Sequence, residues 1–303
     1  MEIGFAITYI VTKMWTTDVT RRASVVLVEG RLWKGIAMIA SHTNKGIKEV
    51  IQLAQKAKAR KEKGLFVAEG MKMFLEAPVD EIKKVYVSES FMEQITTACK
   101  AKLDSILCQY ETVSDEVFKK MSDTKTPQGI LCVMRQKTYG LDAMLITDNP
   151  LLLIIEDIQD PGNLGTIFRA GEGAGVTGII MSGGTVDIYN PKTIRSTMGS
   201  VYRMPFLYTD NIHNIIEEIK KRNVTMYAAH LQGSKVYDDC DYKKGSAFLI
   251  GNESKGLRDE TADKADIRIK IPMLGEVESL NAAVAASILF YEAARQRRTA
   301  TYK

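Results

Sequence analysis

The second half of the chain contains six short runs that are apolar at consecutive positions rather than at alternate ones. They read LLLIIE, GIIMS, MPFLY, VTMYAAH, SAFLIG and IRIKIPM, between Leu151 and Met273. A strand that is apolar on both faces must be covered by helices on both sides, which is typical of a parallel sheet. We therefore predict an α/β domain with a parallel sheet over residues 151–303.

Residues 38–137 alternate helical and strand patterns of their own. The patterns predict helices over 44–61, 71–77, 89–101 and 114–122, and strands over 65–70, 83–88, 105–109 and 129–136. This alternation is typical of a small α/β sandwich with its own core. The polar stretch 138–150 is expected to be the linker to the second domain.

Residues 1–37 form an extension in which we find no clear amphipathic element. The apolar stretch GFAITYIV follows Glu2 rather than positive charge, so it is a poor export signal. The codons of Trp33, Lys34 and Gly35 must be rich in purines, and they lie shortly before the Met38 codon. A bacterial ribosome-binding site is likewise purine-rich and lies shortly before the start codon. We hypothesise that Met38 is the natural start and that the extension is artefactual.

The composition is that of a folded domain protein with a weak preference for anionic partners. Of the 303 residues, 45% are apolar and 26% charged, and the net charge is +4. No apolar run approaches the roughly 20 residues of a membrane-spanning helix, so we expect no membrane partner. The four cysteines have neither zinc-ligand nor disulfide spacing, so we expect no metal and a cytoplasmic location with reduced thiols.

One motif suggests an oxidoreductase but stands in the wrong place. GAGVTG, residues 173–178, fits the G-x-G-x-x-G pattern of dinucleotide-binding loops. That pattern needs a strand before it and a helix after it, whereas here a helical pattern precedes it and the strand GIIMS follows. We expect these glycines to end a helix, where the helix dipole is negative and repels phosphate.

Three polar clusters follow predicted strands of the second domain. They read EDIQDPGNLGTIFRA, LIGNESKGL and IPMLGEVESLNAAVAAS, and they begin at Glu156, Leu249 and Ile271. Each could be only a turn or a helix cap. Open α/β sheets, however, bind their ligands at the carboxyl ends of the strands.

The clusters resemble the motifs of the SpoU or TrmH branch of the SPOUT RNA methyltransferases. The matching residues are Asn163, Gly165, Arg169 and Ala170 in the first motif, Gly251, Asn252, Glu253, Gly256 and Leu257 in the second, and Ile271, Pro272, Met273, Ser279, Leu280 and Asn281 in the third. Arg195, Ser196 and Gly199 resemble a further segment of the family. The first domain resembles, more loosely, the family's ribosomal-protein-like substrate domain.

The resemblance implies a fold and a cofactor. The fold is an α/β knot, in which a deep C-terminal trefoil knot is formed beside a parallel sheet covered by helices, an exception to the rule that chains avoid knots. The chain is implied to be a homodimer and to bind S-adenosylmethionine. The implied cofactor pocket is formed by Leu231, Gly233, Gly251, Ile271, Met273, Leu280 and Asn281.

The implied reaction is methyl transfer to a ribose 2′-oxygen of RNA. The family's catalytic residues correspond to Arg169, Asn163, Glu253, Ser279 and Asn281. Because an arginine stays protonated, we favour a role in which Arg169 grips the adjacent phosphate and lowers the pKa of the hydroxyl, rather than one as a free base. The alternative is a surface arginine that is paired with Glu172.

A basic segment of the first domain is a candidate RNA-binding surface, although it could equally be a solvated helix face. The candidates are Lys45, Lys56, Lys58, Arg60, Lys61 and Lys63, with Arg195 as a further contact near the active site. In the family that the chain resembles, such a substrate domain usually accompanies rRNA enzymes, so the resemblance implies 23S rRNA as the substrate. The alternatives are a tRNA 2′-O-methyltransferase and a non-catalytic RNA-binding or ribosome-assembly factor with the same fold.

Overall fold

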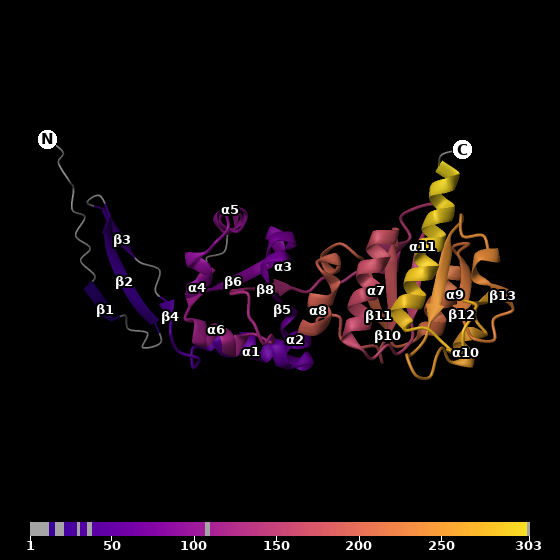
Figure 1. Cartoon of the computed structure of the whole chain (residues 1–303), viewed down its shortest axis with the longest axis horizontal. Helices are drawn as coiled ribbons and strands as arrows, with labels where there is room; N and C mark the ends of the chain where they lie inside the picture. The colour runs from indigo at the N-terminus through magenta and orange to yellow at the C-terminus, as the bar shows by residue number, and fades with distance from the viewer. Residues whose placement is uncertain (1–11, 16–20, 29–30, 35–37, 107–109, 302–303) are drawn as a thin grey trace. The chain divides into compact units, whose positions relative to one another are not determined.

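The computed structural model describes the backbone of residues 12–15, 21–28, 31–34, 38–106 and 110–301, and the side chains of 38–106 and 110–298. The chain divides into two compact units, Met1–Gln136 and Lys137–Lys303 (Figure 1). Among the described residues, no helix has the length and apolar character needed to cross a membrane.

The first unit is a mixed sheet with short helices. Its strands are β1 (Thr12–Trp15), β2 (Arg21–Val28), β3 (Arg31–Lys34), β4 (Met38–Ile39), β5 (Leu65–Glu69), β6 (Ile82–Ser88), β7 (Tyr110–Val113) and β8 (Ile130–Arg135), and the order along the sheet is β1-β2-β4-β7-β6-β8-β5 with β3 paired to β2. Its helices are α1 (Lys45–Gln55), α2 (Ala57–Lys63), α3 (Met71–Glu76), α4 (Glu89–Glu93), α5 (Thr97–Ser105) and α6 (Asp115–Met121). The strands β1 to β3 lie in the extension, where we had found no clear element.

Two helices predicted in this unit are each divided in the structure. The first breaks at Lys56, whose backbone is extended, and the guanidinium of Arg60 donates to the carbonyls of Leu53 and Ala54 at distances of 2.8 and 3.2 Å. Those carbonyls lie in the last turn of α1, where helix partners are missing. In the second, Thr96 caps α5 by accepting from the Cys99 amide at 3.3 Å.

The strand expected at 105–109 was wrong at its first residue, Ser105, which is helical. Helix α5 continues to Ser105, with Cys99 and Leu103 buried one turn apart, and the strand β7 begins at Tyr110. Ser105 therefore ends a helix instead of beginning a strand, and Ile106 follows as the C-cap of that helix. Residues 107–109 lie outside the described part of the chain.

The second unit confirms the predicted parallel sheet. Its strands are β9 (Leu151–Ile155), β10 (Gly178–Ser182), β11 (Phe206–Thr209), β12 (Thr225–Ala229), β13 (Lys235–Val236), β14 (Ser246–Ile250) and β15 (Ile267–Lys270), in the order β11-β10-β9-β14-β12-β15-β13 with every pairing parallel. Its helices are α7 (Pro161–Ala174), α8 (Pro191–Thr197), α9 (Ile212–Lys220), α10 (Asp259–Ala262) and α11 (Ala282–Thr301).

Both faces of this sheet are covered, as its apolar strands require. On one face α9 and α10 bury Ile216 and Ala262 against Met226 and Leu249. On the other face α11 brings Phe290 to Phe248, with ring centres 6.4 Å apart. Strand β9 lies in the sheet between β10 and β14. The chain adds strands first on one side of β9, β10 and β11, and then on its other side, β12 to β15. Such a reversal opens a crevice at the carboxyl ends of the strands.

The helix α7 ends where the sequence predicted. Asp160 caps its start by accepting from the Asn163 amide at 2.8 Å, and Pro161 follows as the first helical residue. Gly175 ends it with a φ of +82°. The glycines of GAGVTG thus close a helix and lead into β10, as we expected.

The stretch expected to be a linker, 138–150, packs on the second unit. It contains a 3-10 turn, Leu141–Met144, and both of these residues are buried in the core under α9. A Cβ atom at Gly178 would overlap the Met144 side chain. The first strand of the sheet is therefore preceded by a segment that already belongs to this unit.

The close packing of α7 on α8 predicts the effect of one methyl group. In Gly165→Ala the new Cβ would lie 2.8 Å from the Thr193 carbonyl oxygen, as well as against Ser196. We expect the free energy of unfolding to fall by about 1–3 kcal/mol, as for other overpacked sites. Urea unfolding measures it, with Gly140→Ala as the control, because nothing lies within 4 Å of that Cβ position. Equal stability of the two variants would contradict the packing argument.

Candidate functional site

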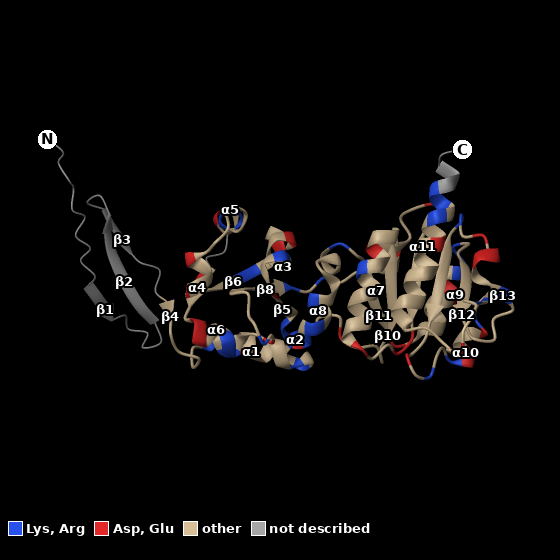
Figure 2. Cartoon of the chain, viewed as in Figure 1, with Lys and Arg blue, Asp and Glu red and all other residues tan. Residues whose placement is uncertain are grey.

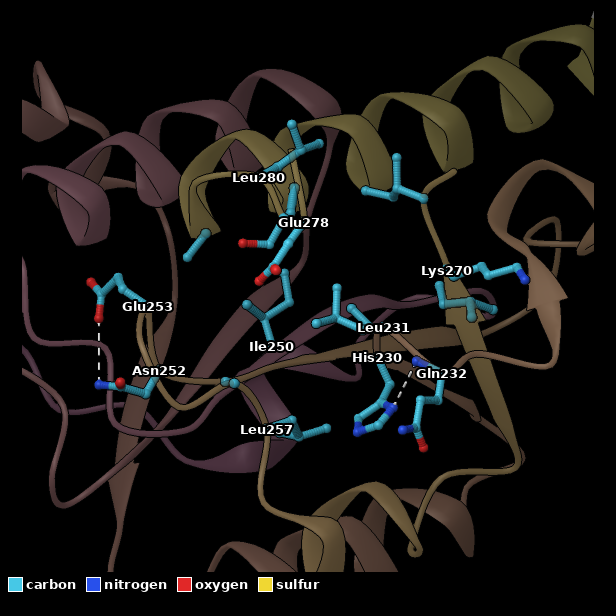
Figure 3. A pocket seen from close by; sticks show the side chains of 18 of the residues that line it. His230, Leu231, Gln232, Ile250, Asn252, Glu253, Leu257, Lys270, Glu278 and Leu280 are labelled. Carbon is cyan, nitrogen blue, oxygen red and sulfur yellow. Dashed lines mark hydrogen bonds between the residues drawn. The ribbon is translucent and has the colours of Figure 1, made fainter. Parts of the chain in front are cut away.

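A cavity of about 650 Å³ opens at the carboxyl ends of β12, β14 and β15 (Figure 3). Its wall is built from residues 229–232, 250–257 and 269–273, together with 278–280, Ala282 and Ala285 around the start of α11. All of these segments except the first belong to the motif clusters or border them. The volume is typical of a small-molecule site.

The loop 251–257 contributes every one of its residues to the cavity wall. It closes on itself through two main-chain hydrogen bonds of 3.0 and 2.9 Å between Asn252 and Gly256. The Asn252 side chain accepts from the Ser254 and Lys255 amides, both at 3.0 Å. Gly256 has a φ of +71°, and a Cβ atom at Gly251 would overlap the Gly256 backbone. Both glycines are therefore needed for this closed shape.

A chain of side-chain hydrogen bonds joins the three motif clusters. Asn281 Nδ2 donates to Asn163 Oδ1 at 2.9 Å, and Asn163 Nδ2 donates to Glu253 Oε1 at 3.0 Å. The Glu253 carboxylate also accepts from the amides of Gln159 and Asp160, at 3.1 and 3.0 Å. Residues far apart in the sequence are thus held together beside the cavity.

These hydrogen bonds keep Glu253 ionised. Partial burial tends to raise the pKa of its carboxyl, but the donors Asn163 Nδ2, Asp160 N and Gln159 N outweigh burial and lower the pKa below its ordinary value. At neutral pH the carboxylate can only accept hydrogen bonds.

The predicted cofactor residues divide into two groups. Those in the cavity wall are Leu231, Gly251, Ile271, Met273 and Leu280. Gly233 is not in the wall; its buried backbone packs so closely on β15 that a side chain would overlap Ile269 and Lys270. Asn281 takes part in the hydrogen-bond chain and caps α11 by accepting from the Ala283 amide at 2.9 Å.

The predicted catalytic residues divide in the same way. Glu253 and Ser279 line the cavity, and Asn163 is bound to Glu253. The side chain of Arg169 lies exposed on α7 and, within the described part of the chain, makes neither a hydrogen bond nor an ion pair. The alternative partner, Glu172, instead accepts from Arg203 Nη2 at 3.1 Å.

The wall also contains polar residues that were not predicted as site residues, among them His230, Lys270 and Glu278. The imidazole of His230 accepts at Nδ1 from the Gln232 amide at 3.2 Å, and it points into the cavity beside Leu257 (Figure 3). His230 directly follows β12 and Lys270 ends β15, so the rule that sites lie at carboxyl ends could have found both.

The basic segment of the first unit is largely exposed, with one exception. Lys45, Lys56, Lys58 and Lys61 are exposed on α1, α2 and the break between them, whereas Lys63 forms an ion pair of 2.7 Å with Glu49. Figure 2 shows the basic residues of these helices in blue. Arg60 is only 3% exposed, and its guanidinium binds carbonyls of α1. It is therefore not available to an RNA phosphate, and its inclusion among the RNA contacts was wrong. Arg195 lies half-buried in α8 of the second unit.

Comparison with family models finds two matches. The model of the SpoU rRNA Methylase family matches residues 150–291, and that of the MRM3-like substrate binding domain matches residues 44–132.

Individual relatives match nearly the whole of their own length. The 23S rRNA (guanosine(2553)-2′-O)-methyltransferase RlmP of Bacillus subtilis is 32% identical over 84% of this chain and 97% of its own. A crystal structure of an AdoMet-bound rRNA methyltransferase from Sinorhizobium meliloti is 34% identical, with a TM-score of 0.75 over 85% of this chain and 97% of its own. The AdoMet complex of AviRb from Streptomyces viridochromogenes is 23% identical over 84% of this chain and 99% of its own, and its TM-score of 0.78 shows the same fold.

The lowered pKa of Glu253 predicts a pH dependence of stability. A carboxyl whose folded-state pKa is depressed stabilises the fold above its unfolded pKa, and that contribution is lost as the pH falls through the folded value. Below the ordinary value of 4.5, the thermal midpoint of the native protein should therefore fall more steeply than that of Glu253→Gln. Thermal unfolding from about pH 6 to pH 3 measures both curves. Parallel curves would contradict the assignment.

Proposed function

The chain belongs to the SpoU rRNA methylase family, and from that premise we propose that it transfers a methyl group from S-adenosylmethionine to a ribose 2′-oxygen in 23S rRNA. The main observation behind the proposal is the series of hydrogen bonds from Asn281 to Asn163 to Glu253. It joins the three motif clusters beside a cavity of small-molecule size. No feature of this site favours the alternative function, a non-catalytic RNA-binding or ribosome-assembly factor.

The cavity fits the cofactor in size and in lining. Ile250, Leu257, Ile269 and Leu280 provide apolar surface for a flat base, and the folded loop 251–257 borders it with main-chain groups. S-adenosylmethionine supplies a methyl group on a sulfonium, which is a strong electrophile. The protein therefore has to position the acceptor hydroxyl and activate it.

We assign that activation to Arg169. Its guanidinium is permanently charged and exposed, so it can grip a phosphate beside the acceptor ribose and lower the pKa of the 2′-hydroxyl. Asn163, Glu253, Ser279 and Asn281 fix the geometry. Because Arg169 does not line the cavity of its own subunit, we propose that it acts across or beside a subunit interface.

We propose that the interface is formed by α7 and α11 of two identical chains. Val284 and Tyr291 are apolar or aromatic and about half exposed on α11, and a Cβ atom at Gly173 of α7 would lie 3.0 Å from the Tyr291 hydroxyl. One of the two helices on this surface, α7, also carries Arg169. Burying exposed apolar side chains against a second copy would stabilise a dimer.

We propose that the first unit holds the RNA. The match to a substrate binding domain over residues 44–132 supports this role, as do the exposed lysines of α1 and α2. Lysines contact phosphates without reading the sequence, so they would position the RNA rather than select the nucleotide. We place the enzyme in the cytoplasm, where ribosomal RNA is modified and where the buried Cys99, Cys132 and Cys240 would stay reduced.

Removing Arg169 should abolish methyl transfer. We expect Arg169→Ala to lose at least about 100-fold in kcat, the scale of a lost transition-state contact. Arg169→Lys should lose most of the activity too, because an ammonium keeps the charge but lacks the planar fork. Transfer of tritium from methyl-labelled S-adenosylmethionine to unmethylated rRNA and tRNA pools, followed by nuclease mapping, measures the rate and identifies the nucleotide.

The controls for this experiment separate the parts of the proposal. Calorimetry should show unchanged S-adenosylmethionine binding by both variants. Label in tRNA alone would contradict the proposal that rRNA is the substrate. Near-normal transfer by Arg169→Lys would contradict the requirement for a planar guanidinium. Light scattering on the native protein should give twice the chain mass of 33.8 kDa, and a mass of one chain would contradict the dimer.

The exposed lysines should set the salt dependence of RNA binding. Replacing Lys56, Lys58 and Lys61 by Gln removes three phosphate contacts, so the slope of log K against log salt should become shallower by about 2. The control replaces Lys221, Lys243 and Lys244, which are exposed on the second unit and change the net charge equally. Filter binding between about 50 and 200 mM salt measures the slopes. An equal change in both variants would show a general charge effect instead of a surface for RNA.

A further inference from the structure

A buried carboxylate that has no place in the proposed chemistry lies directly behind the cofactor loop. Glu156 follows β9 and is only 1% exposed, and it does not line the cavity. Its carboxylate accepts from Arg258 N at 2.9 Å, from Arg258 Nε at 2.8 Å and from Thr261 Oγ1 at 2.6 Å. Arg258 Nη2 lies 2.7 Å from Oε1 as well. The carboxylate is thus surrounded by donors from one short segment.

The same residue also holds the other end of the loop. The main-chain amide of Glu156 donates to the Ile250 carbonyl at 2.9 Å, immediately before the loop 251–257. Its carboxylate binds the Arg258 amide immediately after the loop. The next residue, Asp157, accepts from Asn252 Nδ2 at 2.7 Å through its carbonyl. Both ends of the loop are therefore attached to the end of β9.

We propose that Glu156 is a positioning residue that holds the loop 251–257 in the shape that binds S-adenosylmethionine. This inference rests on the proposed function of the cavity. A buried carboxylate is tolerated only when donors surround it, so its position and those of Arg258 and Thr261 fix one another. Since every residue of the loop lines the cavity, a shift at its end changes the cavity wall.

Removing the charge should loosen the loop before it unfolds the protein. In Glu156→Gln one oxygen becomes an NH₂ group that faces donors, so at least one hydrogen bond to Arg258 or Thr261 is lost. The Arg258 side chain is 60% exposed and can be solvated instead. The lost hydrogen bond should therefore destabilise the end of the loop next to Arg258, whereas Ile250, before the loop, remains paired with β9 in the sheet.

The test measures cofactor binding separately from catalysis. By calorimetry with S-adenosylmethionine, we expect the Kd of Glu156→Gln to rise about tenfold, and KM for S-adenosylmethionine to rise with it. The kcat at saturation should stay within about twofold, because a positioning role of this kind acts on binding. Amide hydrogen exchange without cofactor should become faster in residues 251–258.

A matched control carries the same chemical change elsewhere in the unit. Glu292 of α11 also binds an arginine and a neutral donor, Arg295 and Gln296, and it does not line the cavity. Glu292→Gln should leave both Kd and exchange in 251–258 unchanged. If Glu156→Gln fails to fold, Thr261→Val removes one donor to Glu156, together with the contact of Thr261 Oγ1 to His213 Nε2, and should still raise the Kd by a smaller factor.

The outcomes separate this inference from the proposed function. If the native protein does not bind S-adenosylmethionine, the proposed function fails and the inference falls with it. If the native protein binds and a folded Glu156→Gln or Thr261→Val binds equally well, only the inference is overturned. A fall in kcat with an unchanged Kd would also overturn it, because it would place Glu156 in the chemistry.

Discussion

The parallel pairing of β9 with both β10 and β14 is the constraint on which the site depends. Because all strands run the same way, Glu156, the loop 251–257 and the segment 271–281 leave the sheet at one edge. Their polar groups then meet without any long excursion of the chain, and helices have to cover both apolar faces. One of those helices, α11, begins at the same edge, directly after Asn281.

The sequence predicts the elements of this fold better than it predicts their ends. Consecutive apolar residues identified every long strand of the second unit, and Gly175 ended α7 as the glycine pattern indicated. The break at Lys56 has no glycine or proline to signal it, and the Arg60 hydrogen bonds to carbonyls of α1 that accompany it form only in the folded chain. The strand expected at 105–109 began too early, because Ser105 still belongs to α5 and a short apolar run does not define where its element begins.

For the site, the sequence likewise predicts the residues better than the contacts between them. The resemblance to the family's motifs identified Asn163, Glu253 and Asn281, but not the hydrogen bonds among them, since these residues are up to 118 positions apart. Charge alone also failed to separate Arg60, which is buried, from Arg169, which is exposed. A basic residue is a candidate for RNA only if no carbonyl of its own domain uses it, and that requires the three-dimensional structure.

The hydrogen-bond chain of the site has a fixed direction because both of its ends are fixed. Glu253, kept ionised by its donors, can only accept, whereas the main-chain amides at the start of α11 can only donate. Between them, Asn163 must turn its NH₂ group to Glu253, and Asn281 must turn its oxygen to the Ala283 amide. Each asparagine therefore has a single orientation of its amide. The polar groups presented beside the cavity are set before any ligand binds, which lowers the reorganisation that a reaction there would require.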